Sequence, residues 1–265
     1  MLQDRAGEFR RLHREGLLLL PNAWDAGSAR LIESTGARAI ATTSAGLAWA
    51  GGYADGGGLP SEVLLAAVRA IARVIRVPLT VDIEGGYSHD PEAVAALAAA
   101  VMNAGAVGIN IEDGTDSPEL LCRKIAAIRQ SAARLGVDLF INVRTDVVLR
   151  ALAPAGDVAA EVAGRARQYG EAGCDGVFVP GLSKPAEIET IAAALKPLPL
   201  NLMLVPGLPP IDKLASLGVR RLSAGSALAQ AAFGRVASLT RELLERRADA
   251  IFRESVEYGQ MNKLF

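Results

Sequence analysis

The sequence predicts an α/β protein with the (β/α)₈, or TIM-barrel, fold and extra helices at its C-terminal end. Two observations lead to this prediction: a helix-to-strand unit recurs along the chain, and eight short apolar runs alternate with segments of helical composition. The length of 265 residues agrees, because such barrels run to about 250 residues as one domain. We therefore expect residues 1–265 to form a single barrel domain.

Each copy of the recurring unit contains a helix end, a small residue with a glycine, an apolar run and a glycine-containing turn. The copies are TGARAIATTSAG from Thr35, AGAVGINIEDG from Ala104, AGCDGVFVPG from Ala172 and LGVRRLSAG from Leu217. The first glycine suits a left-handed helix C-cap, and the apolar run suits a strand buried on both faces. Repetition of such a connection indicates parallel β/α architecture.

The apolar runs define eight candidate strands in chain order. They are Leu17–Pro21, Ala39–Ser44, Leu79–Gly85, Gly108–Asp113, Phe140–Thr145, Gly176–Pro180, Leu200–Val205 and Arg221–Ala224. Helices are expected between them, for example over Ala26–Thr35, Ser61–Ile75, Pro91–Ala104 and Pro118–Leu135. Neither GxGxxG nor GxxxxGK[ST] occurs, so an open nucleotide-binding sheet is not supported. The tail from Ala231 is predicted to be helical, either as a packing helix or as a dimerisation element.

Bulk composition excludes several classes of function. The net charge is −1 with 51% hydrophobic residues, which allows a large core and favours neither nucleic acid nor an anionic membrane as partner. Cys122 and Cys174 form neither a disulfide framework nor a zinc spacing. The N-terminal segment lacks a secretory h-region, and no apolar run is long enough to span a membrane. We expect a cytoplasmic protein, with His13 facing solvent from an N-terminal helix.

Polar residues alternate with apolar ones in four of the candidate strands, and alternate residues share a face. The shared faces carry Thr42 and Ser44; Thr80, Asp82 and Glu84; Asn110 and Glu112; and Asn142, Arg144 and Asp146. Because the outer face of a barrel packs against helices, these polar faces are expected to point inward. They lie at the C-terminal ends of the strands, where barrel enzymes carry their sites.

The predicted interior holds more negative than positive charge. Asp82, Glu84, Glu112 and Asp113 exceed what Arg144 alone can neutralise, and buried charges are rarely left unpaired. Hard oxygen ligands at an open site suit Mg²⁺ or Mn²⁺. The alternative is a purely structural ion pair between Asp82 and Arg144.

These residues lie in segments that resemble the isocitrate lyase/phosphoenolpyruvate mutase superfamily in order and spacing. The matching segments are PNAWDAGSAR from Pro21, TSAGL from Thr43, VDIEGGY from Val81, NIED from Asn110 and NVRTD from Asn142. The resemblance implies a Mg²⁺-dependent barrel enzyme that acts on a small carboxylate. It also implies a homo-oligomer, a dimer or tetramer in which a C-terminal helix can be exchanged between subunits.

The resemblance further implies roles for individual residues. Asp82 would bind the metal directly, Glu84 and Glu112 would hold metal-bound waters, and Arg144 would grip the substrate carboxylate. Asp55 would sit on a gating loop within the glycine-rich segment 51–60.

The strand-2 segment would supply a substrate loop, in which Ser44, Ala45 and Gly46 bind the substrate carboxylate or phosphonate. Asn110 is a further candidate for substrate binding. Trp24 is expected either to wall the pocket or to pack in the core, and Tyr87 to act in catalysis or to hold structure.

The chain departs from the lyase pattern after the predicted strand Gly108–Asp113, where a KKCGH-type loop with a catalytic cysteine is absent. Gly114–Cys122 replaces it, and Cys122 is expected to pack inside the next helix. Several reactions therefore remain open. The leading one is carbon–carbon cleavage or decarboxylation of a small 2-oxo or 2-hydroxy di- or tricarboxylic acid through a metal-stabilised enolate. The alternatives are phosphorus–carbon chemistry as a mutase or phosphonopyruvate hydrolase, a phosphate-binding barrel that uses Ala224-Gly225-Ser226, and a barrel that binds a 2-oxo acid without catalysis.

Overall fold

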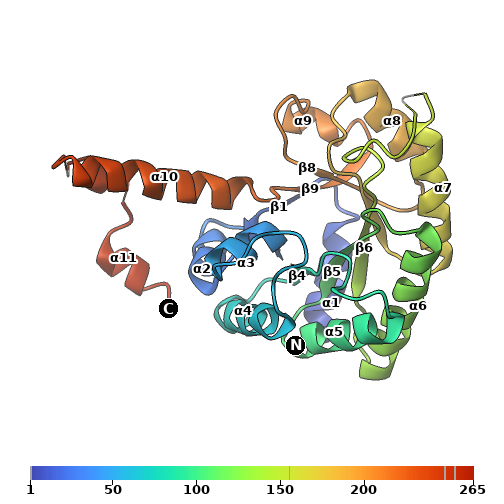
Figure 1. The fold of residues 1–265 in the computed structure, drawn as a ribbon, viewed down its shortest axis with the longest axis horizontal. Coiled ribbons are helices and arrows are strands. Elements are labelled where there is room, and N and C mark those ends of the chain that lie inside the picture. The colour runs from blue at the N-terminus through green and yellow to red at the C-terminus, as the bar shows by residue number, and fades with distance from the viewer. Residues whose placement is uncertain (1, 155, 248, 254) are drawn as a thin grey trace.

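A closed ring of parallel strands surrounded by helices forms the body of the protein (Figure 1). The structure is a computed structural model that describes residues 2–154, 156–247, 249–253 and 255–265. The strands are β1 (Leu18–Leu20), β2 (Asn22–Ala23), β3 (Ile40–Thr42), β4 (Leu79–Asp82), β5 (Gly108–Glu112), β6 (Phe140–Arg144), β7 (Gly176–Phe178), β8 (Leu200–Met203) and β9 (Val219–Ser223).

The ring closes through the first two strands. β1 pairs with β9 and β2 pairs with β3, and only Pro21 separates β1 from β2. Proline has no N–H to donate to a strand ladder, so it divides one strand into two short ones. Together they occupy one position, which gives the eight positions of a (β/α)₈ barrel and confirms the predicted fold.

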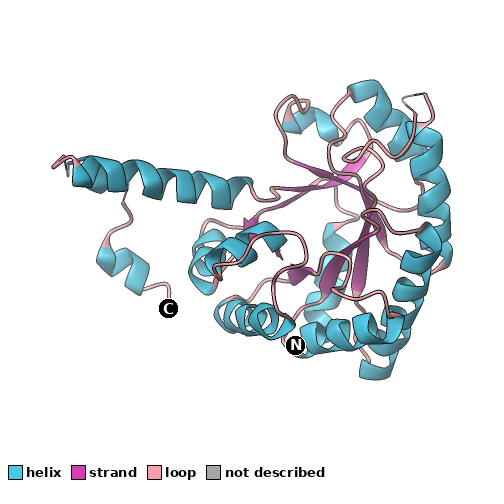
Figure 2. Ribbon diagram, viewed as in Figure 1, coloured by secondary structure: helices cyan, strands magenta, loops and turns pink. Residues whose placement is uncertain are grey.

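Helices follow the strands and cover the outside of the ring (Figure 2). They are α1 (Leu2–Leu12), α2 (Ala26–Ser34), α3 (Ser44–Ala50), α4 (Ser61–Val74), α5 (Pro91–Asn103), α6 (Pro118–Leu135), α7 (Val158–Glu171), α8 (Pro185–Ala194), α9 (Ile211–Leu214), α10 (Ala227–Leu244), the 3₁₀ helix η1 (Asp249–Phe252) and α11 (Tyr258–Asn262). Asp25 caps α2, with its side chain accepting from the Ser28 N–H at 2.6 Å. No described helix is both long and apolar enough to cross a membrane.

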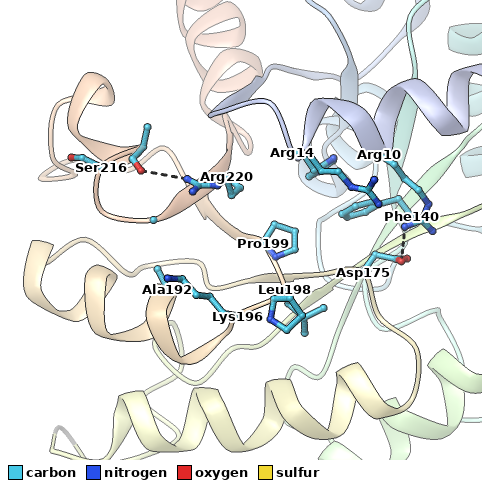
Figure 3. A pocket seen from close by; sticks show the side chains of 14 residues that line it. Arg10, Arg14, Phe140, Asp175, Ala192, Lys196, Leu198, Pro199, Ser216 and Arg220 are labelled. Carbon is cyan, nitrogen blue, oxygen red and sulfur yellow. Dashed lines mark hydrogen bonds and ion pairs between the residues drawn. The ribbon is translucent and has the colours of Figure 1, made fainter.

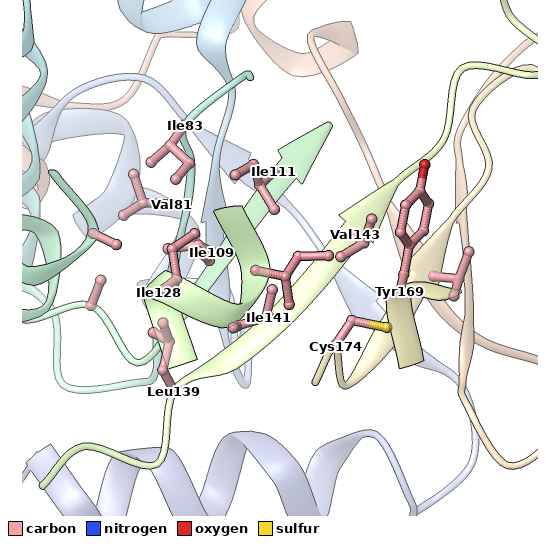
Figure 4. Packing of buried hydrophobic residues seen from close by; sticks show 14 of the residues in the cluster. Val81, Ile83, Ile109, Ile111, Ile128, Leu139, Ile141, Val143, Tyr169 and Cys174 are labelled. Atoms are coloured by element: carbon pink, nitrogen blue, oxygen red, sulfur yellow. The ribbon is translucent and has the colours of Figure 1, made fainter. Parts of the chain in front are cut away.

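The outer faces of β4, β5 and β6 carry the apolar residues that their alternation predicts. Figure 4 shows Val81, Ile109, Ile111 and Val143 packed with residues such as Ile128 of α6, and all of them are fully buried. The polar residues that alternate with them therefore face the inside of the barrel.

The amino-terminal end of the barrel is closed from below by α1. Phe9 and Leu12 join a buried cluster with Leu18, Leu20 and Phe140. The prediction that His13 faces solvent is wrong. Its ring stacks on Phe140 with 4.0 Å between centroids and is 5% exposed, because the turn after α1 directs it under the barrel.

The C-terminal helix α10 extends away from the barrel instead of lying along it (Figure 1). Val236, Leu243 and Leu244 on this helix are exposed. The outer face of β1 is also open, because Leu19 is 51% exposed although its neighbours Leu18 and Leu20 are buried. The interpretation of the tail as a helix packed on its own barrel is therefore wrong for most of α10.

Candidate active site at the mouth of the barrel

The carboxyl ends of β4, β5 and β6 bring the predicted polar residues side by side. The strand register places Asp82 opposite Asn110, and Glu112 opposite Arg144. Parallel strands end at one edge, so side chains separated by about thirty residues in the chain share one rim. The sequence prediction of an inward-facing polar cluster is confirmed for these four residues.

Arg144 is held by two carboxylates. Its Nε and Nη2 donate to the two oxygens of Asp146 at 2.6 and 3.0 Å, and its Nη1 lies 2.8 Å from Glu112 Oε2. Asp146 also accepts from Arg150 at 2.8 Å. Burial alone would lower the pKa of Arg144, but Glu112 and Asp146 hold it above its usual value. Neither partner is Asp82, so the structural pair expected between Asp82 and Arg144 does not form.

Asp82 is oriented by backbone and hydroxyl groups. Its N–H donates to Thr42 Oγ1 at 2.9 Å, and its Oδ1 accepts from the Glu84 N–H at 3.0 Å. Burial raises the pKa of Asp82 above its ordinary value, and the nearby charge of Asp55 adds to the shift. Loop segment 51–60, which carries Asp55, therefore lies close to the mouth of the barrel, as the gating-loop expectation requires.

Glu84 does not continue the inward face of β4, so its predicted place beside Thr80 and Asp82 on a strand is wrong. β4 ends at Asp82, and Glu84 has a left-handed backbone with φ of 49°. Its carboxylate accepts from the Tyr87 hydroxyl at 2.9 Å, and the backbone of Gly57 also hydrogen-bonds to it. Burial raises the pKa of Glu84, and burial together with Glu84 raises the pKa of Tyr87. The Tyr87 hydroxyl is thus engaged in holding Glu84.

Glu112 carries the clearest electrostatic signal at the mouth. Burial raises its pKa to about 8, and the charges of Asp82, Asp146 and Glu84 add to the shift against the opposing effect of Arg144. Burial is the largest cause of the shift, and the three neighbouring carboxylates show that Glu112 would ionise next to negative charge that is already present.

The predicted substrate loop after β3 is a helix. Ser44, Ala45 and Gly46 form the first turn of α3, and the backbone N–H of Ser44 points at the Asp82 carboxylate. An added Cβ on Gly46 would lie 2.6 Å from Thr43 Cγ2 and 2.8 Å from Trp24 Cβ, so this glycine serves close packing. The Trp24 ring lies 6.3 Å from Phe233 of α10, which favours its packing interpretation.

Asp113 belongs to a separate cluster outside the strand ring, so counting it with the mouth carboxylates is wrong. Its carboxylate accepts from the Thr145 hydroxyl at 2.7 Å, Tyr169 at 2.8 Å, Arg165 at 3.0 Å and the Asp146 N–H at 2.9 Å. Alternation along β5 places it on the face opposite Glu112, where Arg165 and Tyr169 of α7 neutralise it.

Sequence reasoning missed two cations near the mouth. Lys124 of α6 is 2% exposed, donates to the Gly85 carbonyl at 2.8 Å and lies 3.7 Å from Asp116. Arg150 and Lys124 line a cavity of about 380 Å³ together with Glu84, Tyr87 and Glu112. Helix and loop residues carry no strand periodicity, so the sequence offered no signal for them.

Deeper in the barrel lies a polar layer that the sequence analysis also missed. Arg221 of β9 is fully buried, and its Nη2 donates to Asn110 Oδ1 at 3.0 Å. Asn142 donates to the same oxygen at 2.9 Å. The Oδ1 atom of Asn110 thus already accepts two hydrogen bonds, and the residue is only 5% exposed. This favours a positioning role for Asn110 over direct substrate binding. The sequence signal that could have revealed this layer is the spacing of Arg221 and Ser223, which places both residues on one face of the strand.

Other expectations near the mouth have simple outcomes. The connection between β5 and α6 is only residues 113–117, so a long lid does not fit there. Cys122 lies within α6 and packs against the core. The Gly225 N–H donates to Asn22 Oδ1 at 3.0 Å. The phosphate-binding alternative requires this N–H as a donor to phosphate, so the hydrogen bond to Asn22 counts against that alternative.

No preformed metal cage is present in the described part of the chain, where no three His, Cys, Asp or Glu side chains converge as ligands. Magnesium, however, is commonly bound through one or two carboxylates and several waters. The donor chemistry of Asp82, Glu84 and Glu112 fits that mode.

Comparison with known proteins identifies the family. The family model described as phosphoenolpyruvate phosphomutase matches residues 9–244. The chain belongs to this family. The match spans every strand of the barrel and the whole of α10, so the motif resemblance is confirmed.

Individual relatives of this phosphomutase-family chain differ in their described chemistry. An uncharacterized Mycobacterium tuberculosis protein is 39% identical over 223 residues, which cover 82% of this chain and 81% of that protein. A Burkholderia cenocepacia structure, proposed to be a phosphonomutase, is 40% identical with a TM-score of 0.86 and covers 91% of this chain and 99% of that one. Oxaloacetate decarboxylase of Ectopseudomonas mendocina is 33% identical over 63% of this chain and 58% of its own length. The chain is an enzyme of the isocitrate lyase/phosphoenolpyruvate mutase superfamily.

Proposed function

We propose that the protein is a Mg²⁺- or Mn²⁺-dependent lyase or decarboxylase. Its substrate is a small 2-oxo or 2-hydroxy di- or tricarboxylic acid, in which it cleaves a carbon–carbon bond. The observation that carries this proposal is the surplus of carboxylate at the mouth. Asp82, Glu84 and Glu112 all have raised pKa values. Of the cations at the mouth, Arg144 pairs with Glu112 and Asp146, Arg150 pairs with Asp146, and Lys124 lies near Asp116.

The three carboxylates suit a divalent cation. Asp82 would bind it directly, and Glu84 and Glu112 would hold its waters. When bound, the cation supplies positive charge for the enolate that remains after a bond next to a 2-oxo group breaks.

The chain's own groups would bind and enclose the substrate. Arg144 Nη1 contacts only Glu112 among the described residues, and this is the donor that a substrate carboxylate would recruit. Asp146 would keep the guanidinium plane fixed meanwhile. The loop carrying Asp55 would exclude water when closed, with Gly57 already in contact with Glu84.

A turnover screen followed by NMR tests this function. The panel contains oxaloacetate, methylisocitrate, substituted malates and phosphonopyruvate, each with Mg²⁺ and with EDTA. We expect cleavage of one carbon–carbon substrate that EDTA abolishes. Asp82→Asn and Glu112→Gln should each reduce turnover at least ~100-fold, because a ligand or its outer partner is lost.

Glu62→Gln, an exposed carboxylate on α4, is the matched control and should retain full turnover. Metal-independent turnover, or full activity of Asp82→Asn, would contradict the proposed site. Binding of a 2-oxo acid without any turnover would favour the non-catalytic alternative.

Phosphorus–carbon chemistry is the second candidate, favoured by the 40% identity to the Burkholderia protein proposed to be a phosphonomutase. The same cation and Arg144 would serve it. Conversion of phosphonopyruvate alone within the panel would select this candidate over the first.

We also propose that α10 is exchanged between subunits of a homo-oligomer. The exposed apolar residues Val236 and Leu243 of α10, and the open face at Leu19, are surfaces that a partner's helix would cover. Removal of residues 227–265 should therefore reduce the mass measured by light scattering to that of a monomer. An unchanged mass would contradict the exchange.

A further inference from the structure

A second cavity lies at the amino-terminal end of the barrel, opposite the mouth. It has a volume of about 620 Å³ and is lined by residues that precede or begin strands, among them Phe140, Asp175, Pro199 and Arg220. The end of α1 adds Arg10, His13 and Arg14 to the lining, and Figure 3 shows several of these side chains around it.

Part of the charge around this cavity is matched within the protein. Arg10 pairs with Asp138 and Asp175 at 2.6 and 2.7 Å, and Asp175 also pairs with Arg129. Two acids thus balance two arginines, and these four residues together leave no net charge.

Three further cations line the cavity and have no acidic partner among the residues that the structure describes. Within those residues, Arg220 donates only to the backbone carbonyls of Ala215 and Val219, at 3.4 and 3.1 Å. Arg14 and Lys196 have no ion pair with any residue in the described ranges. Cations gathered around a concave surface concentrate positive potential inside it. The cavity therefore attracts negative charge from solution.

The buried His13 ring forms part of the cavity wall. Its Nδ1 lies 2.7 Å from the Phe9 carbonyl, and burial lowers the pKa of His13 to about 3, so the ring is neutral and its Nδ1–H donates to Phe9. Nε2 is then an acceptor nitrogen that is closed off from solvent and cannot donate to an anion. His13 therefore contributes a neutral wall, next to which a bound anion would be detected.

We propose that this cavity is a binding site for a small, multiply charged anion with phosphate or carboxylate groups. Arg14, Lys196 and Arg220 supply the charges, and Phe140 with the proline-rich segment 197–199 supplies an apolar wall. The site lies at the opposite end of the barrel from Asp82 and Arg144, so it does not depend on the proposed reaction.

The two histidines of the chain allow a direct test, because each reports on one end of the barrel. His13 lines the amino-terminal cavity, and His89 lies beside the mouth. The experiment follows imidazole ¹H–¹⁵N spectra of the full chain in EDTA while pyrophosphate or citrate is added. We expect saturable shifts of His13 with both anions, and these shifts should not follow any shift of His89, because citrate belongs to the class of acids proposed to bind at the mouth.

Variants establish where the anion binds. Arg14→Gln with Lys196→Gln should weaken the His13 response at least tenfold. Arg73→Gln with Arg134→Gln, which removes the same charge from exposed positions on α4 and α6, should leave it unchanged.

A response to pyrophosphate alone would identify phosphate as the recognised group, and a response to both anions would identify charge. An unperturbed His13, or equal weakening in both double variants, would overturn the proposal.

Discussion

Glu112 ends β5 and Asp113 follows it directly, yet the two carboxylates lie in regions with opposite electrostatics. Asp113, between the barrel wall and α7, accepts hydrogen bonds from four donors and has a cation of its own in Arg165. Glu112, inside the mouth, shares Arg144 with Asp146 and faces Asp82 and Glu84. One region is complete within the protein, whereas the other holds the carboxylates that the proposed cation would neutralise. The difference is the one expected between structural acids and acids that bind a ligand.

The largest expected effect is the loss of stability that follows removal of the Asp113 carboxylate. Asp113→Ala should lower the free energy of unfolding by about 3–5 kcal/mol, because it leaves the buried hydroxyls of Thr145 and Tyr169 without their acceptor and removes one of the two carboxylates of Arg165. Urea denaturation followed by circular dichroism, in EDTA at pH 7, measures the change.

Glu161→Ala provides a matched control, since Glu161 pairs with the same Arg165 at 2.7 Å but is 40% exposed. An exposed pair contributes about 1 kcal/mol or less. If the two variants lost equal stability, Asp113 would not be the structural centre that its four donors indicate.

The sequence could predict the barrel because its signal is local. Four of the eight apolar runs lie between a glycine suited to a left-handed helix C-cap and a turn, which predicts a strand buried on both faces. Eight apolar runs that alternate with helical segments leave few other arrangements. Alternation also placed Asp82, Asn110, Glu112 and Arg144 on inner faces. The same rule would have excluded Asp113 from the mouth, since it follows Glu112 directly.

The remainder of the site depends on contacts that no local pattern encodes. Lys124 reaches the mouth from a helix, and Arg165 reaches Asp113 from another helix fifty-two residues along the chain. Glu84 was misplaced because its strand ends two residues earlier, in a left-handed turn. Alternation cannot show where a strand stops, so it specifies faces more reliably than ends.

A smaller change in the free energy of unfolding, opposite in sign, is expected when the charge of Glu112 at the mouth is removed. The pKa of Glu112 in the folded protein is about 8, above its ordinary value of 4.5. Between these values the folded state binds more protons than the unfolded state, so the contribution of Glu112 to stability falls as pH rises. Glu112→Gln removes this penalty and should raise the free energy of unfolding by roughly 1–3 kcal/mol at pH 8 in EDTA.

At pH 4.5, Glu112 is protonated in the folded state and half protonated in the unfolded state, so the variant should match the parent to within about 0.5 kcal/mol. Urea denaturation at pH 4.5 and pH 8 therefore measures a difference that grows with pH. Added Mg²⁺ should stabilise the parent protein at pH 8 and stabilise Glu112→Gln less, since the cation would occupy the surplus charge that the variant lacks. If Glu112→Gln were instead destabilised at pH 8 as strongly as Asp113→Ala, Glu112 would be a matched partner of Arg144. The acids of the mouth would then be matched by cations within the protein, as they are in the Asp113 cluster, and no external cation would be needed.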